Sequence, residues 1–327
     1  MDGEQPDAPS EDWYRRAADA GNVKAMFNLG SLYHDRDDKA AAERWYHRAA
    51  DAGDLNAMFN LGLLHHELGE LREAEDWLHR AARAGDAKAM FNLGVLLAGR
   101  GAPAEAEDWW RQAADAGDTE AMFNLGLARH QRGDLAEAER RYHQGALAGD
   151  PKAMVNLGAL LQDRGAPAEA WYREAAEAGR ADAKFNLGVL HHERNELAEA
   201  ETWYRRAAED GHPGAKYNLA ALLQEQGDLA GAETWYRAAA DAGEIDAMVN
   251  LGVLHLDRDE PAEAETWWRR AADEGHAEAM YNLGLSHHER GEPAEAEAWY
   301  RKAVDRGHTE AGTDLEQLLT ERDAGEK

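Results

Sequence analysis

The sequence predicts an all-α fold, an α-solenoid of about nine helical hairpins with a capping half repeat at each end. The first observation behind this prediction is an internal repeat of 32 residues, with a single step of 30. Its marker is Asn-Leu-Gly, or Asn-Leu-Ala in one copy, which begins at Asn28, Asn60, Asn92, Asn124, Asn156, Asn186, Asn218, Asn250 and Asn282. Each copy can bury its apolar face only against its neighbours, so such a chain is a stack of repeats.

The other two observations are the apolar spacing and the turn residues within each copy. Apolar and small residues follow the i, i+3, i+4, i+7 pattern twice, from Met26 to Tyr33 and again from Ala42 to Ala49. Gly, followed by Asp or Pro, punctuates the copies after each stripe, as at Gly53, and these residues are stop and start signals for helices. Each copy is therefore predicted to be a helical hairpin.

The unbroken repeat predicts one domain at residues 10–322, between disordered ends at residues 1–9 and 323–327. A half unit at 11–20 is expected to cover the first hairpin. At the other end the motif decays, with Asp314 in place of Asn and Glu316 in place of Gly, as a solvent-facing cap requires. The turn near Gly165 is two residues short, which indicates either a local change of superhelical angle or an incidental deletion.

Composition excludes several classes of function. The formal net charge of -28 disfavours nucleic acids and anionic membranes as partners. The chain has no cysteine, so it has no disulfide and no thiolate metal site. It shows neither a secretory signal nor an apolar run of about 18 residues. These features predict a soluble cytoplasmic protein.

The pattern of Leu-Gly in one helix and Ala, aromatic, Ala in the next resembles the tetratricopeptide repeat. The second helix, written Trp-Tyr-Arg-Arg-Ala-Ala and followed by Ala-x-x-x-Leu-Gly, is more similar still to the Sel-one-like subclass, and the resemblance covers residues 11–322. The unit is shorter than is usual in either family and lacks the longer turn of the Sel-one-like form. The resemblance implies a right-handed superhelix with a concave groove.

The nine asparagines are the candidate peptide-binding residues. Asn is a middling helix former with two donors and two acceptor sites, so its position in the middle of every first helix calls for a hydrogen-bonding partner. A column of Asn side chains is able to hold the peptide groups of an extended chain, and it is similar to the asparagine ladder in the tetratricopeptide region of O-linked N-acetylglucosamine transferase. Alternatively, these side chains bond a carbonyl of the adjacent hairpin and only lock the repeats together.

Large apolar residues directly precede most of the asparagines, as Phe27 does, and we include Phe91, Phe123 and Phe185 among the candidate peptide-binding residues. They either pack against the next repeat or form pockets for ligand side chains, together with aliphatic residues such as Leu63, Val95 and Leu127.

Histidine doublets at His65, His191 and His287, with single residues at a similar helical level, suggest a metal site at first sight. Adjacent helix residues diverge by about 100°, so a doublet cannot chelate one ion. We therefore predict no metal and no cofactor, and interpret the histidines as solvated groove residues, with His130 and His192 as candidate ligand contacts.

One acidic residue follows the histidine level in most copies, at Asp35, Glu67, Asp163, Glu193, Glu225, Asp257 and Glu289. An acidic row along the groove would favour a basic ligand. In the alternative interpretation, the arginines that directly follow, such as Arg36 and Arg258, neutralise this row.

The chain carries no phosphate-binding Gly loop, no nucleophile elbow and no catalytic constellation, so we expect no enzyme. The predicted function is a noncatalytic protein–protein interaction scaffold that binds an extended segment of a partner protein in its groove. We expect a monomer that has neither a nucleic acid nor a membrane as partner. The alternatives are a structural, self-assembling solenoid with an empty groove and a regulator of a linked enzyme or toxin.

Overall fold

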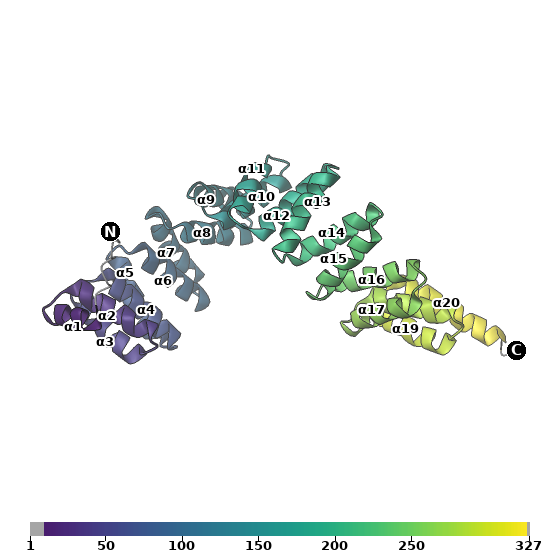
Figure 1. The fold of residues 1–327 in the computed structure, drawn as a ribbon, viewed down its shortest axis with the longest axis horizontal. Helices are drawn as coiled ribbons and strands as arrows, with labels where there is room; N and C mark the ends of the chain where they lie inside the picture. Colours follow the sequence, from purple (N-terminus) through teal and green to yellow (C-terminus); the bar gives the residue numbers. More distant parts are fainter. Residues whose placement is uncertain (1–9, 326–327) are drawn as a thin grey trace, which may run out of the picture. The chain divides into compact units, whose positions relative to one another are not determined.

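A computed structural model describes residues 10–325 of the chain. These residues form 20 α-helices and no strand, and they divide into two compact units between Ala166 and Pro167. Within each unit, consecutive helices pack as hairpins, and each second helix also packs against the first helix of the next hairpin (Figure 1). The predicted all-α class of stacked helical hairpins is therefore confirmed.

The first unit holds four complete hairpins between two single helices. Its helices are α1 (Glu11–Asp19), α2 (Val23–Asp35), α3 (Lys39–Asp51), α4 (Leu55–Glu67), α5 (Leu71–Arg83), α6 (Ala87–Gly99), α7 (Pro103–Asp115), α8 (Thr119–Gln131), α9 (Leu135–Leu147) and α10 (Pro151–Asp163). The even-numbered helices carry the Asn-Leu-Gly motif and are the first helices of the hairpins. The odd-numbered helices are the second helices.

The second unit repeats this arrangement. Its helices are α11 (Glu169–Glu177), α12 (Ala181–Glu193), α13 (Leu197–Glu209), α14 (Pro213–Glu225), α15 (Leu229–Ala240), α16 (Ile245–Asp257), α17 (Pro261–Asp273), α18 (Ala277–Glu289), α19 (Pro293–Asp305) and α20 (Thr309–Gly325). Most helices in both units have the same length, because the sequence repeat places the same stop and start signals in every copy.

Capping residues fix the boundaries of these short helices. At the start of α4 the side chain of Asp54 accepts a hydrogen bond of 2.8 Å from the backbone N–H of Ala57. Just before it, Gly53 ends the preceding helix with φ of 91°, a left-handed conformation that glycine adopts without steric strain. The Ala-Gly-Asp sequence therefore stops one helix and starts the next.

The Gly of Asn-Leu-Gly is required by the packing within each hairpin. A Cβ atom on Gly30 would lie 2.4 Å from the ring of Tyr46, which is a buried residue of the second helix. A Cβ atom on Gly94 would likewise lie 2.4 Å from the indole nitrogen of Trp110. The glycine thus makes room for an aromatic ring of its own hairpin, and this ring fills the core between the two helices.

Single helices cover the outer hairpins at both ends, and α20 continues to Gly325, into the tail that was expected to be disordered from residue 323. α1 buries Ala18 against the first hairpin, and α20 buries Ala311 and Leu318 against the last one, while Glu316 is exposed. Residues 1–9 lie outside the described residues, as do the last two residues of the expected tail at 323–327. The two-residue shortening lies at the boundary between the units, where α11 is a short helix. The single solenoid over residues 10–322 and the change of superhelical angle remain predictions.

Candidate functional site

The asparagines occupy one surface of the first helices in each unit, and each of them is half-buried. Residues three and seven positions later lie on the same side of a helix. We call the surface formed by these three positions within each unit the asparagine face. In the first unit it comprises Asn28, Asn60, Asn92, Asn124 and Asn156, then Ser31, Leu63, Val95, Leu127 and Ala159, and then Asp35, Glu67, Gly99, Gln131 and Asp163. In the second unit it comprises Asn186, Asn218, Asn250 and Asn282, then Val189, Ala221, Val253 and Leu285, and then Glu193, Glu225, Asp257 and Glu289.

Asn250 uses its amide to join two hairpins. Its side-chain N–H group donates hydrogen bonds of 3.2 Å to the hydroxyl of Tyr236 and to the hydroxyl of Tyr217. Burial raises the pKa of Tyr236 to about 12, and the hydrogen bond from Asn250 opposes this rise. The partner of this asparagine is therefore a pair of tyrosine hydroxyls, whereas the repeat-locking alternative assumed a backbone carbonyl.

The pairing of an asparagine with a tyrosine of the preceding second helix recurs in other copies. The amides of Asn60 and Asn218 stand in the same relation to the hydroxyls of Tyr46 and Tyr204, where they oppose the rise in tyrosine pKa that burial causes. These pairs connect the second helix of one hairpin to the first helix of the next. In these copies the asparagine contributes to the packing of successive repeats.

A tryptophan replaces this tyrosine in two copies. Trp110 occupies the tyrosine position before Asn124, and its indole N–H donates to the carbonyl of Phe91 at 3.2 Å. Trp268 occupies the tyrosine position before Asn282 and makes the equivalent bond to Val249, also at 3.2 Å. Within the described part of the chain, neither Asn124 nor Asn282 makes a side-chain hydrogen bond. Their amides remain available to a ligand.

Two hollows lie on either side of Val95 on the asparagine face. One has a volume of about 560 Å³ and is lined by Val95, Asn124 and Leu127 together with Trp110 at its base. The other, of about 600 Å³, is lined by Val95 and by the exposed Leu71 of the preceding second helix. Val95 is itself 44% exposed, so an apolar residue separates the two hollows. A smaller hollow of about 220 Å³ is lined by Asn60 and Leu63, which are the equivalents of Asn124 and Leu127 two repeats earlier.

The candidate aromatic residues are mostly engaged in packing. Phe123 and Phe185 are half-buried, and their rings lie 6.1 Å and 5.9 Å from the rings of Tyr142 and Tyr204 in their own hairpins. Phe185 also stacks on His212 at 4.5 Å. Phe91 is half-buried as well, and its carbonyl receives the indole bond described above. These contacts agree with the packing interpretation more than with open side-chain pockets.

The histidine doublets divide into a buried and an accessible residue. The first histidines, including His65 and His191, are buried, so the interpretation as solvated residues is wrong for them. The Nδ1 atom of His65 lies 2.7 Å from a carboxylate oxygen of Glu70 at the start of the next helix. The second histidines are more accessible, and the candidate residues His130 and His192 are exposed near the rings of Tyr142 and Tyr204.

An arginine–glutamate ladder connects successive hairpins. A glutamate of most second helices pairs with an arginine at the end of the next first helix, at one constant spacing along the sequence. The pairs are Glu11–Arg36, Glu75–Arg100, Glu107–Arg132, Glu139–Arg164, Glu169–Arg194, Glu233–Arg258, Glu265–Arg290 and Glu297–Arg322. Hydrogen bonds from Arg194, then from Arg173, lower the pKa of Glu169. Sequence reasoning missed this ladder, although the constant spacing of its charges was a visible signal.

The ladder decides how the acidic row is to be interpreted. Arg36 and Arg258, which directly follow Asp35 and Asp257, reach back to Glu11 and to Glu233 of the preceding second helices. The proposed neutralisation of the acidic row by these arginines is therefore wrong. The carboxylates of the row are exposed along the asparagine face.

None of the helices in the described residues is long and apolar enough to cross a membrane. A search of curated proteins gives no match. Among solved structures, the chain is similar to a protective antigen with an SLR fold from uropathogenic Escherichia coli strains. The identity is 27% and the TM-score 0.74, with 95% of this chain and 75% of the antigen covered. It is also similar to a Sel1 repeat protein from Oxalobacter formigenes, with 26% identity, a TM-score of 0.60, and coverage of 94% and 90%.

Family models agree with the structural similarity. A tetratricopeptide repeat model matches residues 59–121, 162–215 and 249–311, a second one matches residues 119–144 and 213–238, and the Sel1 repeat model matches residues 10–22 and 23–54. Repeats of this kind are generally noncatalytic scaffolds for protein–protein interaction. Because the first model alone covers more than half of the sequence, the chain belongs to the tetratricopeptide repeat family and carries Sel1-type repeats at its start.

Proposed function

We propose that this protein is a noncatalytic scaffold that binds an extended segment of a partner protein on the asparagine face of its first unit. The observation that carries the proposal is the environment of Asn124. Its amide makes no hydrogen bond to any other described residue and lines a largely apolar hollow of about 560 Å³ beside Val95 and Leu127, which Glu107, Gln131 and Arg132 also line. A polar group among apolar side chains is a typical composition for a ligand site.

The chemistry of this site suits a peptide in extended conformation. One asparagine amide offers both a donor and an acceptor, which match the C=O and N–H groups of a peptide unit independently of its sequence. The hollows on either side of Val95 supply apolar contact for every second side chain of the peptide, because these side chains point to the same side of an extended chain. Asparagines paired with tyrosine would then serve mainly to hold the hairpins in register.

The charge of the face suggests which segments bind. The arginines of the ladder are directed to other carboxylates, so the acidic residues of the row in the first unit, which are Asp35, Glu67 and Asp163, stay negative. Glu67 is an exception in part, since Lys39 lies 3.3 Å from it. With a net charge of -28 over the whole chain, the face would attract segments that combine apolar residues with Lys or Arg.

The experiment uses the full chain to select binders from a random peptide library displayed on phage. Enriched peptides are synthesised and their affinities measured by fluorescence anisotropy. We expect the enriched set to contain basic and apolar residues, and its affinity to fall with rising salt concentration. The variant Asn124→Ala should bind more weakly by about fivefold or more, because one or two hydrogen bonds of about 1 kcal/mol each are lost.

Two further variants complete the design. Val95→Glu places a charge between the hollows and should abolish binding, whereas Gln112→Ala changes an exposed residue of α7 outside both hollows and should leave the affinity unchanged. Circular dichroism verifies that all variants are folded. Equal affinities across Asn124→Ala, Val95→Glu and Gln112→Ala, or no enrichment at all, would argue against this site.

A further inference from the structure

Four buried histidines share one arrangement at the contact between hairpins. They are His65, His191, His255 and His287. In each, Nδ1 lies 2.5–2.7 Å from the glutamate five residues later, and the buried Nε2 has no hydrogen-bond partner in the described residues. Nε2 of His255 lies 3.9 Å from Glu233, and Nε2 of His287 lies 3.7 Å from Glu265, both in the preceding second helix.

In three of these copies, arginine guanidinium groups form ion pairs with the glutamate of the preceding second helix at the position of Glu233. Glu233, for example, pairs with Arg237 four residues later and with Arg258 of the ladder. Glu169 and Glu265 are held in the same way by arginines at the same two positions. The negative charge opposite the histidine is thus balanced from two sides.

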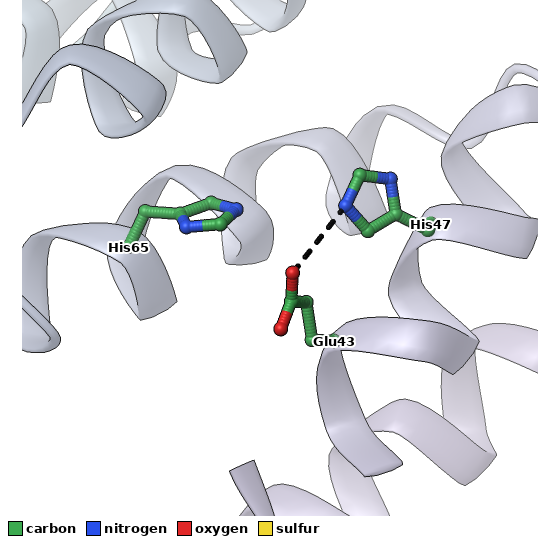
Figure 2. Close-up of side chains that lie close together, drawn as sticks. All are labelled: Glu43, His47 and His65. Atoms are coloured by element: carbon green, nitrogen blue, oxygen red, sulfur yellow. Dashed lines mark ion pairs between the residues drawn. The ribbon is translucent and has the colours of Figure 1, made fainter. Parts of the chain in front are cut away.

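The first copy lacks both arginines. His47 stands where the arginine one helical turn after Glu43 would be, and Leu68 stands where the arginine of the ladder would be. Two imidazoles and one carboxylate therefore meet where the other copies hold an imidazole, a carboxylate and two guanidinium groups. Figure 2 shows Glu43 and His47 of α3 facing His65 of α4, with the carboxylate and both rings directed to one space.

The three residues have the geometry of a metal site. Their ligand atoms all lie within 4.8 Å of one another, and Nε2 of His47 lies 3.8 Å from a carboxylate oxygen of Glu43. Around a tetrahedral zinc ion with bonds of about 2.1 Å, neighbouring ligand atoms are about 3.4 Å apart. Small side-chain rotations suffice to reach that separation, since the side chains of Glu43 and His47 are each 39% exposed. Within the described part of the chain, this is the one group of three such ligands.

The contacts of His65 leave its Nε2 atom available to a metal ion. The carboxylate of Glu70 faces Nδ1 at 2.7 Å and favours the tautomer in which Nδ1 carries the proton and donates it. Nε2 then presents a lone pair, and it is a buried atom with no partner in the described residues. A carboxylate bonded to the second nitrogen of a histidine is the usual outer-shell partner of a metal-bound imidazole.

We propose that Glu43, His47 and His65 bind one divalent transition-metal ion of the zinc type, with water as the fourth ligand. Two imidazoles and a carboxylate form a ligand set that suits Zn²⁺ and disfavours Mg²⁺ and Ca²⁺, which prefer oxygen ligands. The ion links α3 to α4 and so replaces the missing arginine–glutamate pair at this contact between hairpins.

The first experiment is isothermal titration of the metal-free full chain with ZnCl₂, with MgCl₂ as the comparison. We expect one tight site for Zn²⁺ and none for Mg²⁺. The double variant His47→Arg, Leu68→Arg installs the pair of arginines found in the other copies, so it should fold and should lose the tight site. Its affinity should fall by more than about 100-fold, because loss of an outer-shell partner alone costs about 10–100-fold.

A second variant guards against misfolding of the first. His47→Gln removes one partly exposed ligand and leaves the buried His65 in place, so it should also lose the tight site. The chain has 15 histidines, and weak binding to the others is common to all variants. Equal Zn²⁺ affinity and stoichiometry in the wild-type chain and in folded His47→Gln would overturn the proposal, as would the absence of any tight site.

The repeat also allows the site to be transplanted. In the second unit, Arg237→His together with Arg258→Leu reproduces the ligand set of the first copy around Glu233 and His255. This variant should bind two zinc ions in place of one. An unchanged stoichiometry in a folded variant would mean that the residue types and spacing do not suffice, which contradicts the geometric argument.

Discussion

Replacing Asn250 with alanine should separate the two roles of the asparagines. Asn250 donates to two tyrosine hydroxyls in two other helices, whereas Asn124 makes no hydrogen bond to any other described residue. We expect Asn250→Ala to destabilise the protein and to leave peptide binding at the first unit unchanged. Asn124→Ala should weaken peptide binding and leave the stability of the protein nearly unchanged.

The expected magnitude follows from these contacts. Two hydrogen bonds of about 0.5–1.5 kcal/mol each are lost in Asn250→Ala. Alanine is a better helix former than asparagine by roughly 0.5–0.7 kcal/mol, which offsets part of the loss. The hydroxyl of Tyr236 keeps its bond of 3.0 Å to Gln224 and is not left without a partner. The net cost of Asn250→Ala should be about 0.3–2.5 kcal/mol. For Asn124→Ala it should be close to zero or slightly negative.

The assay combines urea unfolding, followed by circular dichroism, with hydrogen exchange resolved to individual helices. Exchange is needed because repeat arrays can open locally, and the two substitutions lie in different units. Faster exchange should be confined to α14–α16 in Asn250→Ala. If both variants unfold at the same urea concentration, or if Asn124→Ala is the less stable one, the distinction between tyrosine-paired and unpaired asparagines is incorrect.

Three further predictions concern the packing, the ladder and the metal site. Gly94→Ala should destabilise the protein by about 1–3 kcal/mol in urea unfolding, because its Cβ atom would lie 2.4 Å from a tryptophan ring, whereas Gly99→Ala in the same helix meets open space and should be neutral or stabilising. The pKa of Glu169 is lowered, so its pairing with Arg194 stabilises the protein above the ordinary glutamate pKa, and this stabilisation is lost as the pH falls through the folded-state pKa. The urea midpoints of wild type and Arg194→Gln should therefore differ at pH 7 and converge as the pH falls below the ordinary glutamate pKa. Glu70→Gln should weaken zinc binding by about 10–100-fold in calorimetry, since it removes the carboxylate behind His65; unchanged affinity would contradict that role.

The helices, their pairing and their caps were predictable because each depends on local sequence. The constant period of the repeat, its two apolar stripes and the Ala-Gly-Asp turns determine where the helices begin and end. The need for glycine after Asn-Leu was also partly visible. Its contact was not, because the ring of Tyr46 that faces Gly30 lies in the other helix of the hairpin.

The partners of polar side chains were less predictable, because they depend on rotamers and on contacts between hairpins. In one of the two interpretations of the acidic row, Arg36 neutralises its neighbour Asp35, but in the structure Arg36 reaches Glu11 across the repeat contact. His65 was expected to be solvated, and it is buried against Glu70. Adjacency along a helix is a poor guide in such cases, since adjacent side chains diverge by about 100° while residues of the next hairpin lie opposite.

A repeat protein nevertheless offers a control that a single domain lacks, because each position can be compared with its equivalents in the same chain. The ladder pairs glutamate with arginine at one constant spacing. Leu68 and Gln226 occupy the arginine position in two copies, so these copies depart from the pattern. At Gln226 the facing residue of the first helix is Leu223, and no histidine is present. At Leu68 the loss of arginine coincides with His47 and with the buried His65. The same lapse therefore has different chemical consequences in the two copies, and only the first one assembles ligands for a metal ion.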